Sequence, residues 1–283
     1  LEGRSGSRLV ENILPAYLDR ARWFRAKART VRGISIRDSI AMNINRADVR
    51  ILLFDVAYSE GASETYMLPV SAVNEKEAGD LRQQYPQALI ADLQIGEENF
   101  FLYDAIYDGA FRQALLGMIR SRRRLKGQRG ELAGIPGSRL RTLLGKDFDP
   151  ASSQVMKTEQ SNSAMIYDDR LFLKLYRMLE NGINPDQEIT RLLTEKSKFE
   201  HTPSFGGALE YHGQSSEPMA VGLLMGLVPN QGDAWNFSLD VLANYIDRLF
   251  SHRSELPALP EPVHHVEVEG AEHFREFRGY VLP

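Results

Sequence analysis

Hydrophobic positions in the first part of the chain change from helical spacing to alternation. Over residues 7–29, apolar side chains recur every three or four positions, which predicts two short helical segments. Over 31–40, 49–57 and 65–73, apolar and polar residues alternate, which predicts strands. A turn at Gly61 separates the last two strands, so these two are expected to form a hairpin.

The pattern then predicts a helix over 75–84, strands over 88–95 and 99–106, and a helix over 108–119. These elements bury their apolar faces together when one antiparallel sheet carries helices at its edge. The predicted fold class of this region is therefore α+β.

A cluster of cations followed by glycines separates this region from the rest of the chain. Six Lys or Arg residues fall within 120–129, and a glycine-rich stretch continues to Gly137. Nucleic acid can bind such a cluster, but this one contains no aromatic residue and the whole chain is net acidic, so a solvated linker is favoured. The predicted domains are 1–128 and 129–283.

The second region has a distinctive order of predicted elements. In sequence these are strands over 155–160, 164–167 and 171–176, a helix from 185, strands over 207–211 and 219–228, and a helix over 238–250. Three strands, a helix, two strands and a linker to a further helix is the order of a protein-kinase-like N-lobe, with about five antiparallel strands and one main helix.

The start of the main helix carries strong local signals. Asn184 is a good N-cap, Pro185 occupies the first helical position, and Gln187 stands at the capping-box position. The apolar residues of the helix and the segment after it predict a buried face. These residues are Ile189, Leu192, Leu193 and Phe199.

Composition and charge narrow the class of protein. The 283 residues are 43% hydrophobic, which allows two compact units, and the formal net charge of −4 gives no general attraction to nucleic acid or an anionic membrane. No cysteine is present, so disulfides and thiolate metal sites are excluded. No apolar run approaches the roughly 20 residues that span a bilayer, and the default location is the cytoplasm.

Lys174 is the first candidate for chemistry. It is a cation in the middle of the apolar strand 171–176, the position from which a kinase lysine reaches the α and β phosphates of ATP. Glu188, near the start of the following helix, is its expected ion-pair partner. Each residue taken alone has an alternative interpretation. Lys174 is then an ordinary surface lysine, and Glu188 is a glutamate that the helix dipole favours in a first helical turn.

The polar stretch Ser161, Asn162 and Ser163 occupies the place of a phosphate-covering loop. It contains no glycine and matches neither a Walker loop nor the glycine pattern of protein kinases, so an ordinary hairpin turn is the alternative. Gly145-Lys146-Asp147 lacks the features of a P-loop, and Asp147-Phe148-Asp149 precedes the lysine strand. Both are chance similarities.

Several ordered motifs resemble those of the maltokinases. They are Glu159-Gln160-Ser161-Asn162-Ser163, Leu171-Phe172-Leu173-Lys174-Leu175-Tyr176-Arg177, Gly182-Ile183-Asn184-Pro185-Asp186-Gln187-Glu188-Ile189 and Val228-Pro229-Asn230-Gln231-Gly232-Asp233-Ala234-Trp235. Nearer the start, Leu14-Pro15-Ala16-Tyr17-Leu18, Arg22-Trp23-Phe24 with Lys27, and Phe101-Leu102-Tyr103-Asp104-Ala105-Ile106-Tyr107-Asp108 resemble the N-terminal cap domain of that family. The resemblance spans most of residues 8–250.

The resemblance implies ATP-dependent phosphorylation of maltose to maltose 1-phosphate, in a path from trehalose to α-glucan. It implies that Lys174 binds phosphate, that Glu188 orients it, and that the hinge, with Val228 and Asn230, faces adenine. Residues 161–163 would cover the phosphates. Mg²⁺ is the implied second cofactor, and trehalose synthase is an expected fused or associated partner.

The catalytic carboxylates and Mg²⁺ ligands of such a kinase belong to its C-lobe, and only 33 residues follow Phe250. We therefore expect a cap domain and N-lobe that end before the catalytic lobe, with no catalytic or metal-binding residue in this chain and no turnover of maltose. Two alternatives stay open: a regulatory or assembly module of a trehalose synthase polypeptide, and the N-lobe of another sugar or aminoglycoside-type kinase.

Overall fold

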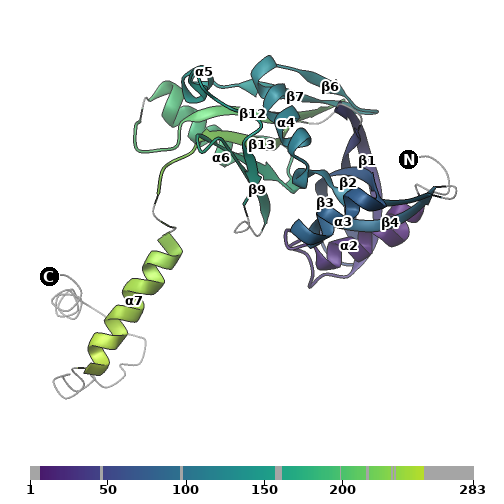
Figure 1. Ribbon diagram of the computed structural model, residues 1–283, viewed down its shortest axis with the longest axis horizontal. Coiled ribbons are helices and arrows are strands. Elements are labelled where there is room, and N and C mark those ends of the chain that lie inside the picture. Colours follow the sequence, from purple (N-terminus) through teal and green to yellow (C-terminus); the bar gives the residue numbers. More distant parts are fainter. Residues whose placement is uncertain are drawn as a thin grey trace. The chain divides into compact units, whose positions relative to one another are not determined.

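A computed structural model describes residues 7–44, 47–95, 98–156, 161–197, 199–214, 217–230, 232 and 234–251 (Figure 1). The chain divides into two compact units, Leu1–Val228 and Pro229–Pro283. The second unit contains the helix α7 (Ala234–Ser251), which begins four residues before the predicted helix.

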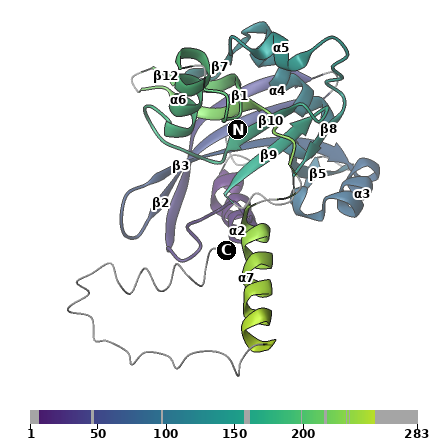
Figure 2. The same ribbon diagram turned by 90° about the vertical axis from the view of Figure 1, so that its left-hand side faces the viewer.

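The N-terminal part of the first unit forms the predicted antiparallel sheet, here called the first sheet. Its order is β1-β2-β3-β5-β4. The strands are β1 (Val31–Ile44), β2 (Ala47–Tyr58), β3 (Glu64–Asn74), β4 (Leu89–Ile95) and β5 (Glu98–Asp104). The helical elements are the π-helical turn η1 (Leu9–Ile13), α2 (Leu14–Arg20), α3 (Glu75–Gln84) and the 3-10 turns η2 (Pro86–Ala88) and η3 (Ala105–Tyr107). The long β2–β3 hairpin, predicted from Gly61, is visible in Figure 2.

Polar caps set the helix boundaries in this region. The Asn74 side chain accepts a hydrogen bond from Glu77 N and begins α3, and the Asp108 side chain accepts one from Ala110 N and begins α4 (Gly109–Ser121). Arg122, in the left-handed conformation, ends α4. The helices predicted over 75–84 and 108–119 are therefore found where their caps place them.

The second sheet contains seven strands in the order β6-β7-β12-β13-β10-β9-β8. The strands are β6 (Arg124–Lys126), β7 (Gly130–Pro136), β8 (Ser153–Val155), β9 (Asn162–Tyr167), β10 (Leu171–Tyr176), β12 (Phe205–Gly213) and β13 (Met219–Gly226). Short helices α5 (Leu140–Leu144) and α6 (Pro185–Arg191) and the π-helical turn η4 (Leu192–Lys196) connect them. The predicted order of three strands, a helix and two strands is confirmed, and the α+β class with it. The first of these strands is β8, and residues 157–160 of the strand predicted over 155–160 lie outside the described residues.

The expected linker at 120–129 was wrong. β6 and β7 form an antiparallel pair, and β7 pairs with β12, so the cationic segment and the stretch after it each add one strand to the edge of the second sheet. A pattern of charges cannot report a partner strand that lies some 75 residues away in the sequence. The predicted boundary at 128/129 falls in the β6–β7 turn, and the division into those two domains stays a prediction.

A short strand connects the two sheets. β11 (Met178–Leu179) follows β10 of the second sheet but pairs with β3 of the first, where Met178 faces Tyr66. The intervening residue, Arg177, accepts a hydrogen bond from Met67 N at 2.8 Å through its carbonyl oxygen. Residues 177–179 therefore carry the chain from one sheet to the other.

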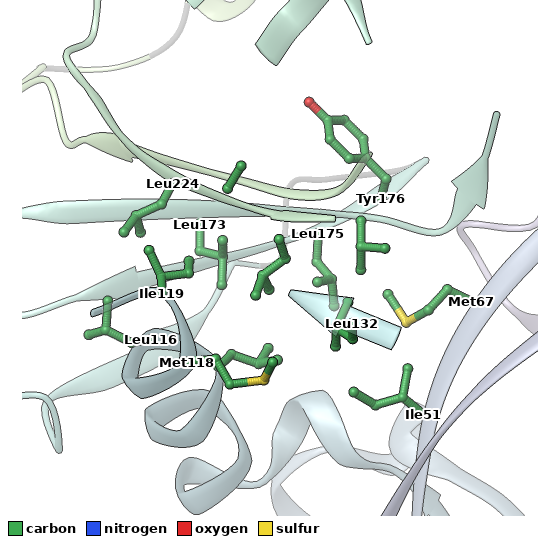
Figure 3. Close-up of a cluster of buried hydrophobic side chains, with 14 of the residues drawn as sticks. Ile51, Met67, Leu116, Met118, Ile119, Leu132, Leu173, Leu175, Tyr176 and Leu224 are labelled. Carbon is green, nitrogen blue, oxygen red and sulfur yellow. The ribbon is translucent and has the colours of Figure 1, made fainter. Parts of the chain in front are cut away.

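The shared core lies between the sheets and α4. Leu173 and Leu175 of the second sheet point toward Met118 and Ile119 of α4, and Ile51 of the first sheet belongs to the same cluster (Figure 3). All five side chains are buried. Burial of each large aliphatic side chain contributes about 1.5–3 kcal/mol, so this cluster holds the two sheets in one unit.

The predicted buried face of the main helix was wrong. Ile189 is 53% exposed, Leu192 47% and Phe199 45%. The α6–η4 segment is instead anchored through polar contacts, including a hydrogen bond from Gln187 Nε2 to Glu210 Oε1 on β12 at 2.5 Å. The apolar spacing of this segment is helical, but periodicity does not tell which partner covers the apolar side.

Gly134 gives a test of the contact between β7 and α4. A Cβ at Gly134 would overlap the Met118 carbonyl and lie 2.8 Å from Ile119 N, so Gly134→Ala requires the backbone to move. We expect the free energy of unfolding to fall by about 1–3 kcal/mol in urea titrations. Gly117→Ala, in α4 and with no atom within 4 Å of a new Cβ, is the control and is expected to stabilise by up to about 1 kcal/mol. Equal stability of both variants would contradict this packing.

Candidate functional site

Lys174 lies on the face of the second sheet opposite to the core. It pairs with Ala164 on β9 and Leu223 on β13. Successive side chains on a strand point to opposite faces, so Lys174 points away from the side where Leu173 and Leu175 meet α4 (Figure 3). Its side chain is 24% exposed, accessible to a ligand yet partly removed from water.

Half-buried apolar side chains continue this face. Phe172 pairs with Ile166 on one side and Met225 on the other, so the three form a row across β9, β10 and β13. Each is only partly exposed. An apolar row two residues from a lysine is the kind of surface on which the flat face of a purine packs.

The ion pair that holds Lys174 involves Asp186. Lys174 Nζ lies 2.6 Å from Asp186 Oδ2. Asp186 belongs to the first turn of α6, whose N-cap Asn184 accepts a hydrogen bond from Gln187 N at 3.3 Å. The cap and the helix start thus fix the carboxylate over the strand that carries the lysine.

Tyr176 completes this polar group. Its hydroxyl donates to Asp186 Oδ2 at 3.4 Å, and Lys174 Nζ lies 5.5 Å from the centre of its ring. Burial, with the neighbouring Asp186 carboxylate, raises the pKa of the Tyr176 phenol. The phenol therefore stays a neutral hydrogen-bond donor, and the group carries one positive and one negative charge.

Glu188, the expected partner of Lys174, is directed elsewhere. It is exposed and lines a separate cleft of 820 Å³ beside Arg191, Glu195, Lys196 and Glu217. Glu188 lies two residues after Asp186, and positions two apart on a helix do not share a face. The structure therefore pairs Lys174 with Asp186 and not with Glu188.

The polar stretch 161–163 is divided between two roles. Asn162 begins β9, with its Nδ2 atom 3.5 Å from Ser161 Oγ. Ser163 pairs with Leu175, which places it on the core face, opposite to Lys174. It is 6% exposed, and its hydroxyl accepts a hydrogen bond from Arg177 Nε at 2.8 Å. Ser163 therefore does not face the same space as Lys174, contrary to its predicted position.

The predicted hinge residues follow β13. Val228 is 51% exposed and ends the first unit, while Asn230 belongs to the second unit and accepts a hydrogen bond from Gly232 N at 3.2 Å. Leu227 N donates to Arg170 O at 2.8 Å, which fixes the exit of the chain from the second sheet. A role of Val228 and Asn230 toward adenine stays a prediction.

A further cleft of 540 Å³ lies between the two sheets. Asp104 and Arg177, which both line this cleft, form a buried ion pair, with Arg177 Nη2 2.5 Å from Asp104 Oδ2. Burial raises the pKa of Asp104, and the charge of Arg177 opposes that shift.

The sequence did not predict a role for Asp104 or Arg177. Both belong to motifs that resemble the maltokinases: Arg177 is the last residue of the motif at 171–177, and Asp104 lies within the motif at 101–108. Asp186 was also missed, because two acidic residues stand in one helical turn and only the fold distinguishes them.

Among the residues that the structure describes, no group of three or more His, Asp or Glu side chains is placed to hold a metal ion. Within the same ranges, the helices are too short or too polar to cross a membrane.

Comparison with known proteins finds a family model that matches the region containing the first sheet. Residues 17–108 match the family model of the maltokinase N-terminal cap domain. The matched segment includes β1 to β5, α2 from Tyr17 and α3. The predicted resemblance to maltokinases is therefore confirmed for this region, which is called the cap region below.

Solved structures of glucosamine kinase are similar to the chain over most of its length. One, a complex with glucosamine, ADP and inorganic phosphate, has 13% identity and a TM-score of 0.45, and the match covers 90% of this chain and 47% of that one. A second, crystal form A, has 13% identity and a TM-score of 0.46, with the same coverage. The chain thus spans about half the length of these structures.

The carboxylate that pairs with Lys174 can be tested by chemical labelling. In Asp186→Asn the amine loses its 2.6 Å contact, so we expect an amine-reactive ester to modify Lys174 about twofold to fivefold faster. Mass spectrometry of the Lys174 peptide measures the rate. Glu188→Gln, a neutral substitution two residues away, is the control and should leave the rate unchanged. Faster labelling of Lys174 in Glu188→Gln, with no change in Asp186→Asn, would instead make Glu188 the partner of Lys174.

Proposed function

We propose that this chain contributes the cap region and the ATP-binding lobe of a sugar kinase of the maltokinase type, with maltose as the acceptor and maltose 1-phosphate as the product. ATP supplies the phosphoryl group in such a reaction. The observation that carries the proposal is the position of Lys174, on the open face of a kinase-like sheet and oriented by Asp186 at 2.6 Å.

Three features support ATP as the ligand of this face. Lys174 offers a cation whose geometry is fixed by an ion pair, and Ser161 and Asn162 lie at the entrance of the adjoining strand β9. The row of Phe172, Ile166 and Met225 supplies an apolar surface next to the lysine. We assign the phosphate contacts to Lys174, Ser161 and Asn162 and the base contacts to the apolar row and the predicted hinge.

The cap-region match supports maltose as the acceptor, because residues 17–108 match a domain named for maltokinases. The catalytic base and the Mg²⁺ ligands that a kinase requires are assigned to a lobe other than the second sheet. Association with trehalose synthase belongs to the same proposal and rests on the sequence resemblance.

Nucleotide binding is tested by calorimetry of ATP with Mg²⁺ on this chain and on Lys174→Ala. A hydrogen bond to a charged group contributes about 1.5–3 kcal/mol, so the dissociation constant is expected to rise about tenfold to hundredfold. Lys146→Ala removes an equally positive but exposed lysine outside the proposed site, and its dissociation constant should equal that of the parent. An equal loss of ATP affinity in both variants would show that the effect comes from the net charge of the chain and not from a contact of Lys174.

The acceptor is tested by ADP release with maltose, glucosamine or glucose, in the natural polypeptide that contains this chain. Release that depends on maltose supports the proposal, whereas release that depends on glucosamine assigns the lobe to another sugar kinase. If that polypeptide binds no ATP, the kinase proposal fails and an assembly role beside trehalose synthase replaces it.

A further inference from the structure

Among the residues that the structure describes, Arg177 is the most buried charged residue, and it lies where the chain passes from the second sheet to the first. Its side chain is 0% exposed among the described residues. It follows Tyr176, the last residue of β10, and precedes β11, which pairs with β3. A guanidinium removed from water is strongly unfavourable unless its N–H groups find acceptors, so its contacts show what holds it in place.

The contacts on one side of Arg177 belong to the cap region. Nη2 donates to Asp104 Oδ2 at 2.5 Å, and the guanidinium carbon lies 4.9 Å from the centre of the Trp23 ring. Asp104 is 1% exposed and is itself held by the Ile106 N–H at 3.2 Å and the Tyr17 hydroxyl at 3.4 Å. The cap region thus provides a fixed, buried anion for this arginine.

The contact on the other side belongs to β9. Nε of Arg177 donates to Ser163 Oγ at 2.8 Å, and both residues are buried. Ser163 is adjacent to Asn162, where β9 begins, and Ala164, which pairs with Lys174. The planar guanidinium therefore connects a cap-region carboxylate to the strand entrance beside the proposed phosphate contacts.

The third nitrogen of the Arg177 guanidinium, Nη1, indicates that stability alone does not explain the ion pair. Arg177 Nη1 is buried and has no hydrogen-bond partner among the described residues. An apolar pair of similar volume can often replace a buried ion pair without loss of stability, so an incompletely satisfied pair suits a role in fixing geometry. Arginine fits that role because its fork reaches two acceptors at fixed angles.

We propose that Arg177 is a positioning residue through which the cap region fixes the entrance of β9, and with it Ser161 and Asn162, for binding nucleotide phosphates. The proposal rests on the proposed function for its nucleotide part. It assigns the cap region a mechanical role in the site on the opposite face of the second sheet. Asp104 and Ser163 are the two ends of the connection, and neither touches the nucleotide.

Two variants separate positioning from folding. Arg177→Lys keeps a cation for Asp104 but loses the fork that also reaches Ser163. The double variant Asp104→Asn with Arg177→Met removes both charges together and keeps an acceptor for the Ile106 N–H, so no unpaired charge is left buried. Both variants are expected to unfold within a few degrees of the parent.

Hydrogen exchange and ATP binding are then measured on each folded variant. We expect amide exchange over Asn162–Tyr167 to accelerate about tenfold and the dissociation constant for ATP with Mg²⁺ to rise about tenfold, the effect of losing one charge-assisted hydrogen bond. Exchange in β2 and β12 should not change. Unaltered exchange over Asn162–Tyr167 in both variants would overturn the proposal.

Tyr211→Phe provides the matched control. The Tyr211 hydroxyl on β12 donates to Asp38 of β1 at 2.8 Å, so its loss also weakens a contact between the sheets but does not involve β9. Faster exchange over Asn162–Tyr167 in this control as well would assign the effect to general loosening and overturn the proposal. Because exchange is measured without ligand, a parent that binds no ATP contradicts the proposed function, while the exchange data still decide whether Arg177 fixes β9.

Discussion

The architecture of the first unit depends on charged groups that are removed from water where the two sheets meet. Arg177 and Asp104 pair with each other, and Asp38 of β1 accepts hydrogen bonds from the Tyr211 hydroxyl and Gln128 N. Arg112 of α4 donates to Ile106 O at 2.9 Å. Because a buried charge without partners is strongly unfavourable, each of these groups can be buried only while both sheets keep their places.

Arg112 shows how such a group joins parts that are distant in sequence. Its Nε donates to Ser153 Oγ of β8 at 3.0 Å, and its carbonyl accepts from the Tyr167 hydroxyl of β9 at 2.8 Å. Burial lowers the pKa of Arg112, which expresses the same unfavourable desolvation. Apolar packing around α4 supplies the driving force for association, and these directional contacts select one relative position of the sheets.

The two faces of the second sheet have different physical roles. On one face, Leu173 and Leu175 enter the shared core, while on the other Lys174 and Tyr176 meet Asp186 of α6. Alternation along one strand thus combines a rigid support with a charged group held in a defined position. A ligand site built on such a strand gains its precision from the core behind it.

The sequence by itself determined the elements with strong local signals. The helix over 75–84 and the strand over 171–176 have the predicted bounds, since an N-cap at Asn74 and an apolar strand with one lysine are local features. The motifs also pointed to the maltokinase cap, which the match over 17–108 confirms. Local chemistry was enough in these cases because neighbours in sequence provide the interactions.

Only the tertiary structure decided which distant residues meet. The pairing of β11 with β3, the choice of Asp186 over Glu188, and the direction of Ser163 toward Arg177 all depend on strand register and helix rotation. A shift of one residue in register or two along a helix turns a side chain to another face, and composition does not encode that shift. The sequence therefore placed Lys174 on its strand, while the contacts of Lys174 and Ser163 were set by long-range pairing, and their role in a site stays a prediction.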